Sequence, residues 1–460
     1  MSTVLEGRPP TASARLPRPV PRSAAPGGAV VRGALVAGCL LVVAFWWSGT
    51  PAAAGATPGG AATGAGELAG LLAAFLVCAQ LLLIGRVPWF ERAVGFDRLV
   101  AWHRSLGTSV VLLVLTHVAL MVVGGALLDR QTPWGEAVSI LTTQPEMVSA
   151  FVGTGLFVLV GATSARLARR VLSYEAWFVV HLSVYVGIYL TFGHQIAAGA
   201  HFVADPVARA VWTALYVATA AALLTWRVLV PLLAHRRMLL RVEHVVPEAP
   251  GVVSVWLQGR AVDELEARGG QFVLLRFLVR GHLTTAHPYS LSMVPTAHRL
   301  RVTVAALGDH SADVARLRTG TRVLVEGPFG RFTADAARGH RSLLVAGGAG
   351  IGPIRALAQE LVARGHDVQV VHRAHDVAGL ALGRELTGVP GLRYLALPGR
   401  RARLGYDPLD REHLAAAVPD IAGRDVFVCG PESMTAAVVD VARTLGVPRR
   451  AIHHEELSLA

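Results

Sequence analysis

Two apolar stretches of the chain each begin and end with a histidine: HRSLGTSVVLLVLTH at residues 103–117 and HLSVYVGIYLTFGH at residues 181–194. At about 1.5 Å of rise per helical residue, the two histidines of a stretch lie about 20 Å apart along a helix. That distance is most of the roughly 30 Å thickness of a bilayer core. Imidazole is a common axial ligand of haem iron, so the sequence predicts four haem ligands: His103, His117, His181 and His194. Two such helices would hold two stacked haems and carry electrons across a membrane.

A single histidine in a membrane helix more often forms a hydrogen bond between helices. Two pairs with nearly equal spacing favour haem ligation instead. At about 100° per residue, the ends of the first stretch lie about 40° apart around a helix, but the ends of the second lie about 140° apart. The second stretch therefore needs a bend, a π-bulge or a register change, for which Gly187 and Gly193 are the candidate positions.

The composition is that of a membrane protein with a soluble part. Of the 460 residues, 53% are hydrophobic and 16% are charged, which is too apolar for a wholly soluble chain. Six windows before residue 235 are apolar enough to span a bilayer: 29–47, 68–84, 106–128, 147–165, 176–192 and 210–226. The sequence after residue 236 has a soluble pattern and is long enough for two domains.

The formal net charge of +12 is carried by arginines that favour one side of the membrane rather than a nucleic-acid surface. They cluster at the second and fourth connections and after the sixth window: Arg86, Arg92, Arg98, Arg104, Arg166, Arg169, Arg170, Arg227, Arg236 and Arg237. The positive-inside rule then predicts a multi-pass protein of the cell membrane with both termini in the cytoplasm. In this orientation His103 and His181 would hold an inner haem, and His117 and His194 an outer one.

The N-terminal residues 1–28 are rich in proline, arginine and alanine, and we expect a disordered cytoplasmic tail. The first apolar window is wide and lacks a suitable small-residue cleavage site, so it is interpreted as an anchor rather than a signal peptide. The chain has three cysteines, which excludes a four-thiolate iron–sulfur site within one chain and argues against a disulfide framework.

Residues 236–334 show the short β-type runs of a small antiparallel barrel. One strand carries His287-Pro288-Tyr289-Ser290, in which Tyr289 would lie against an isoalloxazine ring and Ser290 would hydrogen-bond its N5. The turn that follows contains Gly308, Asp309 and Ser311 and starts a helix, where backbone N–H groups bind phosphate. The alternative for this turn is an ordinary N-cap by Ser311.

Residues 335–460 alternate strands and helices, with two glycine-containing turns after strands. The first, followed by a predicted helix from Ile354, reads Gly347-Gly348-Ala349-Gly350-Ile351-Gly352-Pro353. The second reads Cys429-Gly430-Pro431. Glycines let a backbone approach a pyrophosphate, and open α/β sheets bind ligands at the carboxyl ends of their strands. The spacing is not G-x-G-x-x-G, and the alternative for Cys429 is a small buried residue.

These linked motifs resemble the ferric reductase and NADPH oxidase family over residues 30–460, and the soluble half resembles the ferredoxin–NADP reductase superfamily. The resemblance implies a multidomain fold: a six-helix transmembrane bundle (29–235), an antiparallel β-barrel FAD domain (236–334) and an α/β NAD(P)-binding domain (335–460). It implies an NAD(P)H-dependent flavohaem oxidoreductase that passes electrons through FAD and two b-type haems to an external acceptor. In the family pattern Cys429 would sit near the nicotinamide, and Glu455 or Glu456 near the flavin.

Departures from the family pattern leave the acceptor open. Met121 stands where NADPH oxidases carry a second histidine, and the outer part of the second span has no arginine. Dioxygen is therefore less favoured, and a ferric chelate, a quinone or a protein are the other candidates. The chain ends in LSLA at 457–460 rather than with an aromatic residue.

The choice between NADPH and NADH is open as well. Arg373, or Arg400 and Arg401, would contact a 2′-phosphate, unless these arginines form only a basic surface patch. Two alternative functions are a membrane-anchored cytoplasmic flavin reductase whose spans carry no haem, and a conducting subunit for a separate reductase. The sequence does not specify an oligomeric state or an accessory subunit.

Overall fold

The computed structural model describes residues 27–51, 55–165, 168, 171–283, 286–306 and 309–456. The chain divides into two compact units, Ala25–Val230 and Pro231–Ala460. The tail at residues 1–26, three of the arginines expected to face the cytoplasm (Arg166, Arg169 and Arg170), Gly308 and the final segment 457–460 lie outside the described residues.

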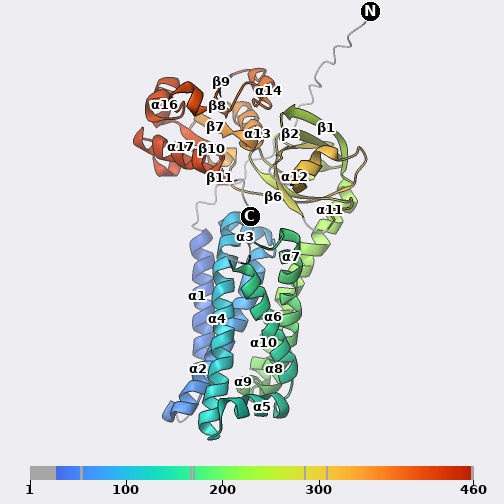
Figure 1. The fold of residues 1–460 in the computed structure, drawn as a ribbon, viewed down its shortest axis with the longest axis vertical. Helices are drawn as coiled ribbons and strands as arrows, with labels where there is room; N and C mark the ends of the chain where they lie inside the picture. Colours follow the sequence, from blue (N-terminus) through green and yellow to red (C-terminus); the bar gives the residue numbers. More distant parts are fainter. Residues whose placement is uncertain are drawn as a thin grey trace, which may run out of the picture. The chain divides into compact units, whose positions relative to one another are not determined.

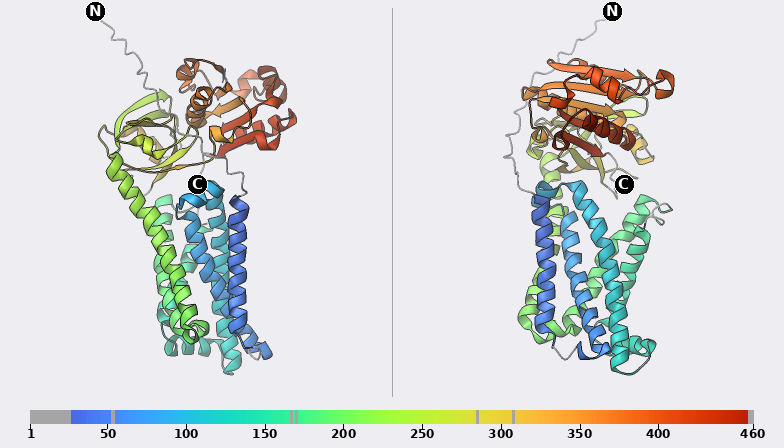
Figure 2. Two further views of the ribbon diagram at one scale, coloured as in Figure 1. Left: turned by 180° about the vertical axis from the view of Figure 1, so that it is seen from behind. Right: turned by 90° about the vertical axis from the view of Figure 1, so that its left-hand side faces the viewer.

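The first unit is a bundle of long apolar helices that lie side by side (Figures 1 and 2). Six stretches among the described residues are long and apolar enough to span a membrane, in agreement with the sequence: Gly27–Gly49, Pro58–Ile84, Arg98–Leu128, Met147–Ser164, Glu175–Ala198 and Pro206–Met238. The helices are α1 (Gly27–Gly49), α2 (Pro58–Ile84), α3 (Pro88–Val94), α4 (Phe96–Leu128), α5 (Pro133–Thr143), α6 (Met147–Ser164), α7 (Tyr174–Leu182), α8 (Val184–Ala198), α9 (Ala200–Ala204), α10 (Pro206–Leu224) and α11 (Val230–Met238), with a π-helical turn at Thr225–Leu229.

The fifth span is interrupted, but not at the glycines that the sequence suggested. Helix α7 ends and α8 begins on either side of Ser183, whose N–H and hydroxyl both donate to the carbonyl of Val180, at 3.0 and 2.7 Å. Gly187 and Gly193 both lie within α8. Gly187 instead allows close helix packing, because a Cβ on it would lie 3.2 Å from the carbonyl oxygen of Gly153 of α6.

The second unit begins with two three-stranded antiparallel sheets, ordered β1-β2-β5 and β4-β3-β6. The strands are β1 (Arg241–Ala249), β2 (Val252–Gln258), β3 (Phe272–Phe277), β4 (His287–Ser290), β5 (Arg299–Ala305) and β6 (Val323–Phe329). Single bridges connect the sheets, Arg241 to Arg322 and Leu291 to Val302. The expected barrel is therefore present as two sheets with an apolar core between them, because the edge strands meet at only one residue pair on each side.

The remainder of the second unit is a five-stranded parallel sheet, ordered β11-β10-β7-β8-β9. Its strands are β7 (Arg341–Gly347), β8 (Asp367–Ala374), β9 (Leu392–Pro398), β10 (Asp425–Gly430) and β11 (Ile452–Glu456). Alternate strand residues bury against α13 (Ile351–Ala363) on one face and against α16 (Arg411–Ala417) and α17 (Glu432–Thr444) on the other (Figure 2). Helix α13 begins at Ile351, three residues earlier than predicted, because Pro353 is accommodated in its first turn.

Candidate functional site

The membrane unit brings the four histidines together as two pairs. The ring centres of His103 and His181 lie 6.0 Å apart, and those of His117 and His194 lie 6.3 Å apart. Each pair joins α4 to the fifth span, with His181 on α7 and His194 on α8. All four side chains are half-buried. The partners within each pair are those expected from the sequence.

The spacing within each pair suits a metal ion between two imidazoles. An imidazole nitrogen lies about 2 Å from a bound metal ion, and its ring centre lies about 1 Å further back. Two imidazoles on opposite sides of one ion therefore have ring centres about 6 Å apart. Among the described residues no group of three or more histidine, cysteine, aspartate or glutamate side chains is arranged to hold a metal ion. Any metal between these histidines would need further ligands from a cofactor.

Hydrogen bonds that the imidazoles donate to carbonyls of helix α2 orient one histidine of each pair. The Nδ1 of His117 lies 2.8 Å from the carbonyl oxygen of Gly66, and the Nδ1 of His103 lies 3.3 Å from that of Gln80. Because a carbonyl only accepts, Nδ1 carries the proton in both rings and Nε2 keeps its lone pair. This is the arrangement in which metal-binding histidines are usually held.

A small-residue motif on α2 makes room for His117, and the sequence analysis did not identify it. A Cβ on Gly70 would lie 2.7 Å from Nδ1 and 3.0 Å from Cε1 of His117. Gly66 and Gly70 are four residues apart and so share one helix face. A small-xxx-small pattern opposite a histidine-bearing span is the signal that would have predicted this contact.

The proposed flavin motif lies on β4, where the residue pairs join Tyr289 to Val273 and Ser290 to Phe272 of β3. The Tyr289 side chain is only 7% exposed and packs edge-on against Phe277 at 5.9 Å. Burial raises the pKa of its phenol. Of the expected pyrophosphate turn, Gly308 lies outside the described residues, and Ser311 lies in the short helix α12 (Asp309–Asp313).

The two glycine turns of the parallel sheet lie against each other. They follow β7 and β10, which are neighbours in the sheet although β8 and β9 come between them in the chain. The strand order reverses here, and such switch points bind ligands in open α/β sheets. A Cβ on Gly350 would lie 2.1 Å from the carbonyl oxygen of Cys429, and one on Gly347 would lie 2.5 Å from Sδ of Met434. Only glycine permits this contact between the two turns.

Cys429 is fully buried at the end of β10, beside Glu455 of β11 in the strand register. Burial raises the pKa of its thiol, and the nearby Glu455 carboxylate raises it further. A Cβ on Gly330, in the turn after β6, would lie 3.5 Å from Oε1 of Glu455. Glu455 therefore faces the antiparallel sheets, whereas the Glu456 side chain is not described.

Buried ion pairs connect the antiparallel and parallel sheets of the second unit. Arg268 donates to Glu360 of α13 at 3.1 Å, and both side chains are almost fully buried. Glu385 accepts a hydrogen bond from Arg301 at 2.6 Å and forms an ion pair with Arg355 at 2.9 Å. Burial alone would raise the pKa of Glu385, but the two arginines outweigh it and hold that pKa below its ordinary value. Sequence reasoning missed these contacts.

Comparisons with known proteins find relatives of both the membrane unit and the soluble unit. The ferric reductase like transmembrane component family matches residues 69–192. The chain is 28% identical over 234 residues to a flavohemoprotein of Chromobacterium violaceum, covering 45% of this chain and 57% of that protein. It is 28% identical over 219 residues to NADH oxidoreductase HCR of Escherichia coli, covering 46% and 65%. It is also 30% identical over 196 residues to the electron transfer subunit of dihydroorotate dehydrogenase B of a Geobacillus species, covering 42% and 74%.

The chain is a ferric reductase-like transmembrane protein fused to a ferredoxin reductase-type module. It spans little more than half the length of several curated relatives that it matches. The matched segment of the ferric reductase-like part contains His103, His117 and His181 and ends two residues before His194.

Two of the three arginines expected at a 2′-phosphate, Arg373 and Arg401, are engaged elsewhere in this ferric reductase-like chain. Arg373 donates to the carbonyl oxygens of Leu397, at 2.8 Å, and Ala374. Burial lowers the pKa of Arg373, and nearby Arg401 contributes to the lowering. Arg401 itself pairs with Asp407 at 2.7 Å. The guanidinium of Arg373 is thus held against the ends of β8 and β9, and the preference between NADPH and NADH stays a prediction.

Proposed function

We propose that this chain is a transmembrane oxidoreductase that passes electrons from cytoplasmic NAD(P)H, through FAD and two bis-histidine b-type haems, to an acceptor on the other side of the membrane. The observation that carries the proposal is the pairing of His103 with His181 and of His117 with His194, with ring centres about 6 Å apart. The same proposal includes the domain limits 29–235, 236–334 and 335–460. It also includes a location in the cell membrane with both termini in the cytoplasm.

The bound groups would supply redox chemistry that side chains lack: nicotinamide gives a hydride, flavin exchanges two electrons or one, and haem iron takes one. The residues would fix these groups in position. Each histidine pair would hold one haem iron, and ligation by two imidazoles would favour electron transfer over the binding of a further ligand. The carbonyls of Gly66 and Gln80 would hold His117 and His103 with Nε2 directed to the iron.

In the soluble module, Tyr289 and Ser290 would contact the flavin ring, with His287, Pro288, Asp309 and Ser311 around its ribityl and phosphate groups. The turns with Gly347, Gly348, Gly350, Gly352 and Pro353, and with Gly430 and Pro431, would admit the dinucleotide. Cys429 would stay a neutral thiol at physiological pH, because burial raises its pKa. It would therefore shape the nicotinamide pocket and would not act as a nucleophile.

The proposal is tested on the purified full-length protein by a reduced-minus-oxidised spectrum with haem per chain quantified. We expect a b-type signal from two haems. His117→Leu or His194→Leu should remove the outer haem and stop the reduction of an external acceptor by oriented vesicles, while NAD(P)H still reduces the flavin. His201→Leu is the matched control, because His201 contacts Glu67 at 3.7 Å and is not part of either pair.

Two results would overturn the proposal. Absence of any b-type signal in protein that still reduces its flavin would favour the membrane-anchored flavin reductase. External reduction that survives both histidine variants would show that the assignment of the outer pair is wrong. An acceptor panel with a ferric chelate, a quinone and dioxygen then identifies the acceptor class.

A further inference from the structure

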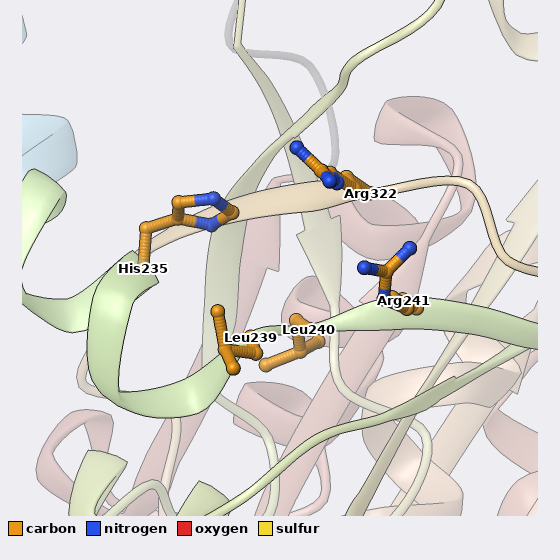
Figure 3. Close-up of a pocket in the computed structure, with 5 residues that line it drawn as sticks. All are labelled: His235, Leu239, Leu240, Arg241 and Arg322. Carbon is orange, nitrogen blue, oxygen red and sulfur yellow. The ribbon is translucent and has the colours of Figure 1, made fainter.

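A small basic pocket lies at the start of the second unit, away from the motifs discussed above. It is lined by His235, Leu239, Leu240, Arg241 and Arg322. Figure 3 shows the imidazole of His235 on one side and the two guanidinium groups on the other, with the leucines between them. The lining residues come from the end of α11, the start of β1 and the residue before β6.

The charges in this pocket have no acidic partner among the described residues. Arg241 and Arg322 face each other in an antiparallel bridge, where like charges are destabilising. Arg241 donates to the carbonyl of Gly320 at 3.1 Å, and the Arg322 side chain forms no hydrogen bond or ion pair within the described part of the chain. The Nδ1 of His235 is buried without a hydrogen-bond partner. An anion between these groups would relieve the repulsion and satisfy the donors.

The pocket comes directly after the sixth membrane span. Residues 211–233 are mostly apolar and helical, and at about 1.5 Å per residue they extend about 35 Å, close to the bilayer core thickness. The only charged side chain in this segment, Arg227, donates to the carbonyl of Ile84 at 3.2 Å. Leu232 and Leu233 are 49% and 53% exposed. His235 follows by two residues, near the end of the candidate span Pro206–Met238, where we expect the lipid headgroups.

The pocket is distinct from the proposed flavin site. Arg322 precedes β6, and Phe329 ends that strand beside Phe272, the residue that pairs with Ser290. Seven residues at about 3.3 Å each separate the two ends of β6 by roughly 20 Å. A ligand of this pocket would therefore be a different molecule from the flavin.

We propose that His235, Arg241 and Arg322 bind a phosphate group, supplied by an anionic lipid headgroup or by a soluble phosphate. Guanidinium groups bind phosphate oxygens in pairs of hydrogen bonds, and a neighbouring imidazole adds a third donor. Leu239 and Leu240 give the pocket an apolar floor that suits the carbon next to a phosphate ester.

The test measures binding of a fluorescent short-chain phosphatidic acid to the full-length protein in neutral detergent. The double variant R241Q/R322Q should bind at least about 25-fold more weakly, because each arginine supplies a charge-assisted hydrogen bond to the phosphate. The matched control is R236Q/R237Q, which removes two neighbouring charges that do not line the pocket and should change binding less than about twofold, because solvent and salt screen charges that do not touch the ligand. Displacement of the probe by millimolar inorganic phosphate assigns the site to a soluble phosphate, and lack of displacement assigns it to the lipid headgroup.

Equal weakening in both double variants would show general charge attraction and overturn the proposal. The absence of saturable binding by the wild type would do the same. R241K/R322K keeps the charges but removes the paired donors. If the glutamine variant does not fold, wild-type affinity in this lysine variant overturns the proposal, and intermediate affinity supports it.

Discussion

The contact between Gly70 and His117 yields a prediction whose size follows from the structure. In Gly70→Ala the new Cβ would lie 2.7 Å from Nδ1 of His117, where ordinary contact begins at 3.4 Å. The imidazole or helix α2 must therefore move by about 0.7 Å, and overpacking of this kind costs about 1–3 kcal/mol. Moving the ring also lengthens the 2.8 Å hydrogen bond to Gly66, at about 1 kcal/mol.

Together these costs are about 2–4 kcal/mol, or roughly a 30- to 700-fold lower affinity for haem at the outer pair. We expect haem per chain in Gly70→Ala to fall from two toward one, with loss of one component in a redox titration. Reduction of an external acceptor should fall in parallel, while reduction of the flavin by NAD(P)H should not change. These measurements separate a local effect at the outer pair from a general defect.

Gly64→Ala is the matched control on the same helix, since its Cβ would lie 3.5 Å from the Trp46 ring, an ordinary contact. It should retain two haems. Two haems per chain and an unchanged titration in Gly70→Ala would refute the reasoning from steric contact. Equal haem loss in Gly64→Ala would attribute the effect to the helix rather than to His117.

Three further predictions concern the soluble module. Gly350→Ala forces its turn away from the Cys429 carbonyl and should lower kcat/KM for NAD(P)H-driven flavin reduction about 5- to 150-fold with FAD still bound. Glu360→Gln removes the buried carboxylate that pairs with Arg268 at 3.1 Å and leaves that arginine beside Asp335 at 3.5 Å, so it should cost at most about 3–5 kcal/mol and should increase amide hydrogen exchange in α13. Burial lowers the pKa of His372 to about 4, so the folded state binds fewer protons than the unfolded one as pH falls from about 6.5. Stability, followed by exchange in β8, should fall by about 3 kcal/mol between pH 6.5 and pH 4.

Each of these predictions has a control in the same module. Gly423→Ala places its Cβ in open space and should leave flavin reduction unchanged. Arg341→Gln breaks an exposed pair with Asp420 and should cost less than about 1 kcal/mol. His372→Asn should flatten the pH dependence of exchange in β8, and a slope equal to that of the wild type would contradict the assignment to this histidine.

The six membrane spans and the two glycine-containing turns after strands could be predicted from the sequence, because each depends on a local pattern. Apolar length alone defines a membrane span, and a glycine after a buried strand is visible in the sequence. The position of the break in the fifth span could not be predicted in this way. A serine hydroxyl that bonds the carbonyl of Val180 competes with the helix, and this competition at Ser183 leaves no periodic signal. Gly187, the expected position, serves helix packing instead.

The ion pairs of the soluble module were missed for a different reason. Arg268 and Glu360 are 92 residues apart in the chain, and each alone looks like a surface charge. They become buried only when the antiparallel sheets pack on α13. A charge pair of this kind is specified by tertiary packing, so no local spacing predicts it. The same holds for Arg241 and Arg322, which are brought together by a single bridge.

The break at Ser183 also explains how His181 and His194, which are 13 residues apart, can both pair with histidines of the same helix, α4. In α4, a continuous helix, 14 residues return His117 to nearly the face of His103. In a continuous fifth span, His181 and His194 would point about 140° apart and only one could face α4. Helices α7 and α8 are separate segments joined at Ser183, whose ψ of −16° departs from the regular helical value, so the two histidines need not keep the offset of a continuous helix. Both pairs then reach the same separation of about 6 Å, which a straight helix with this spacing would not allow.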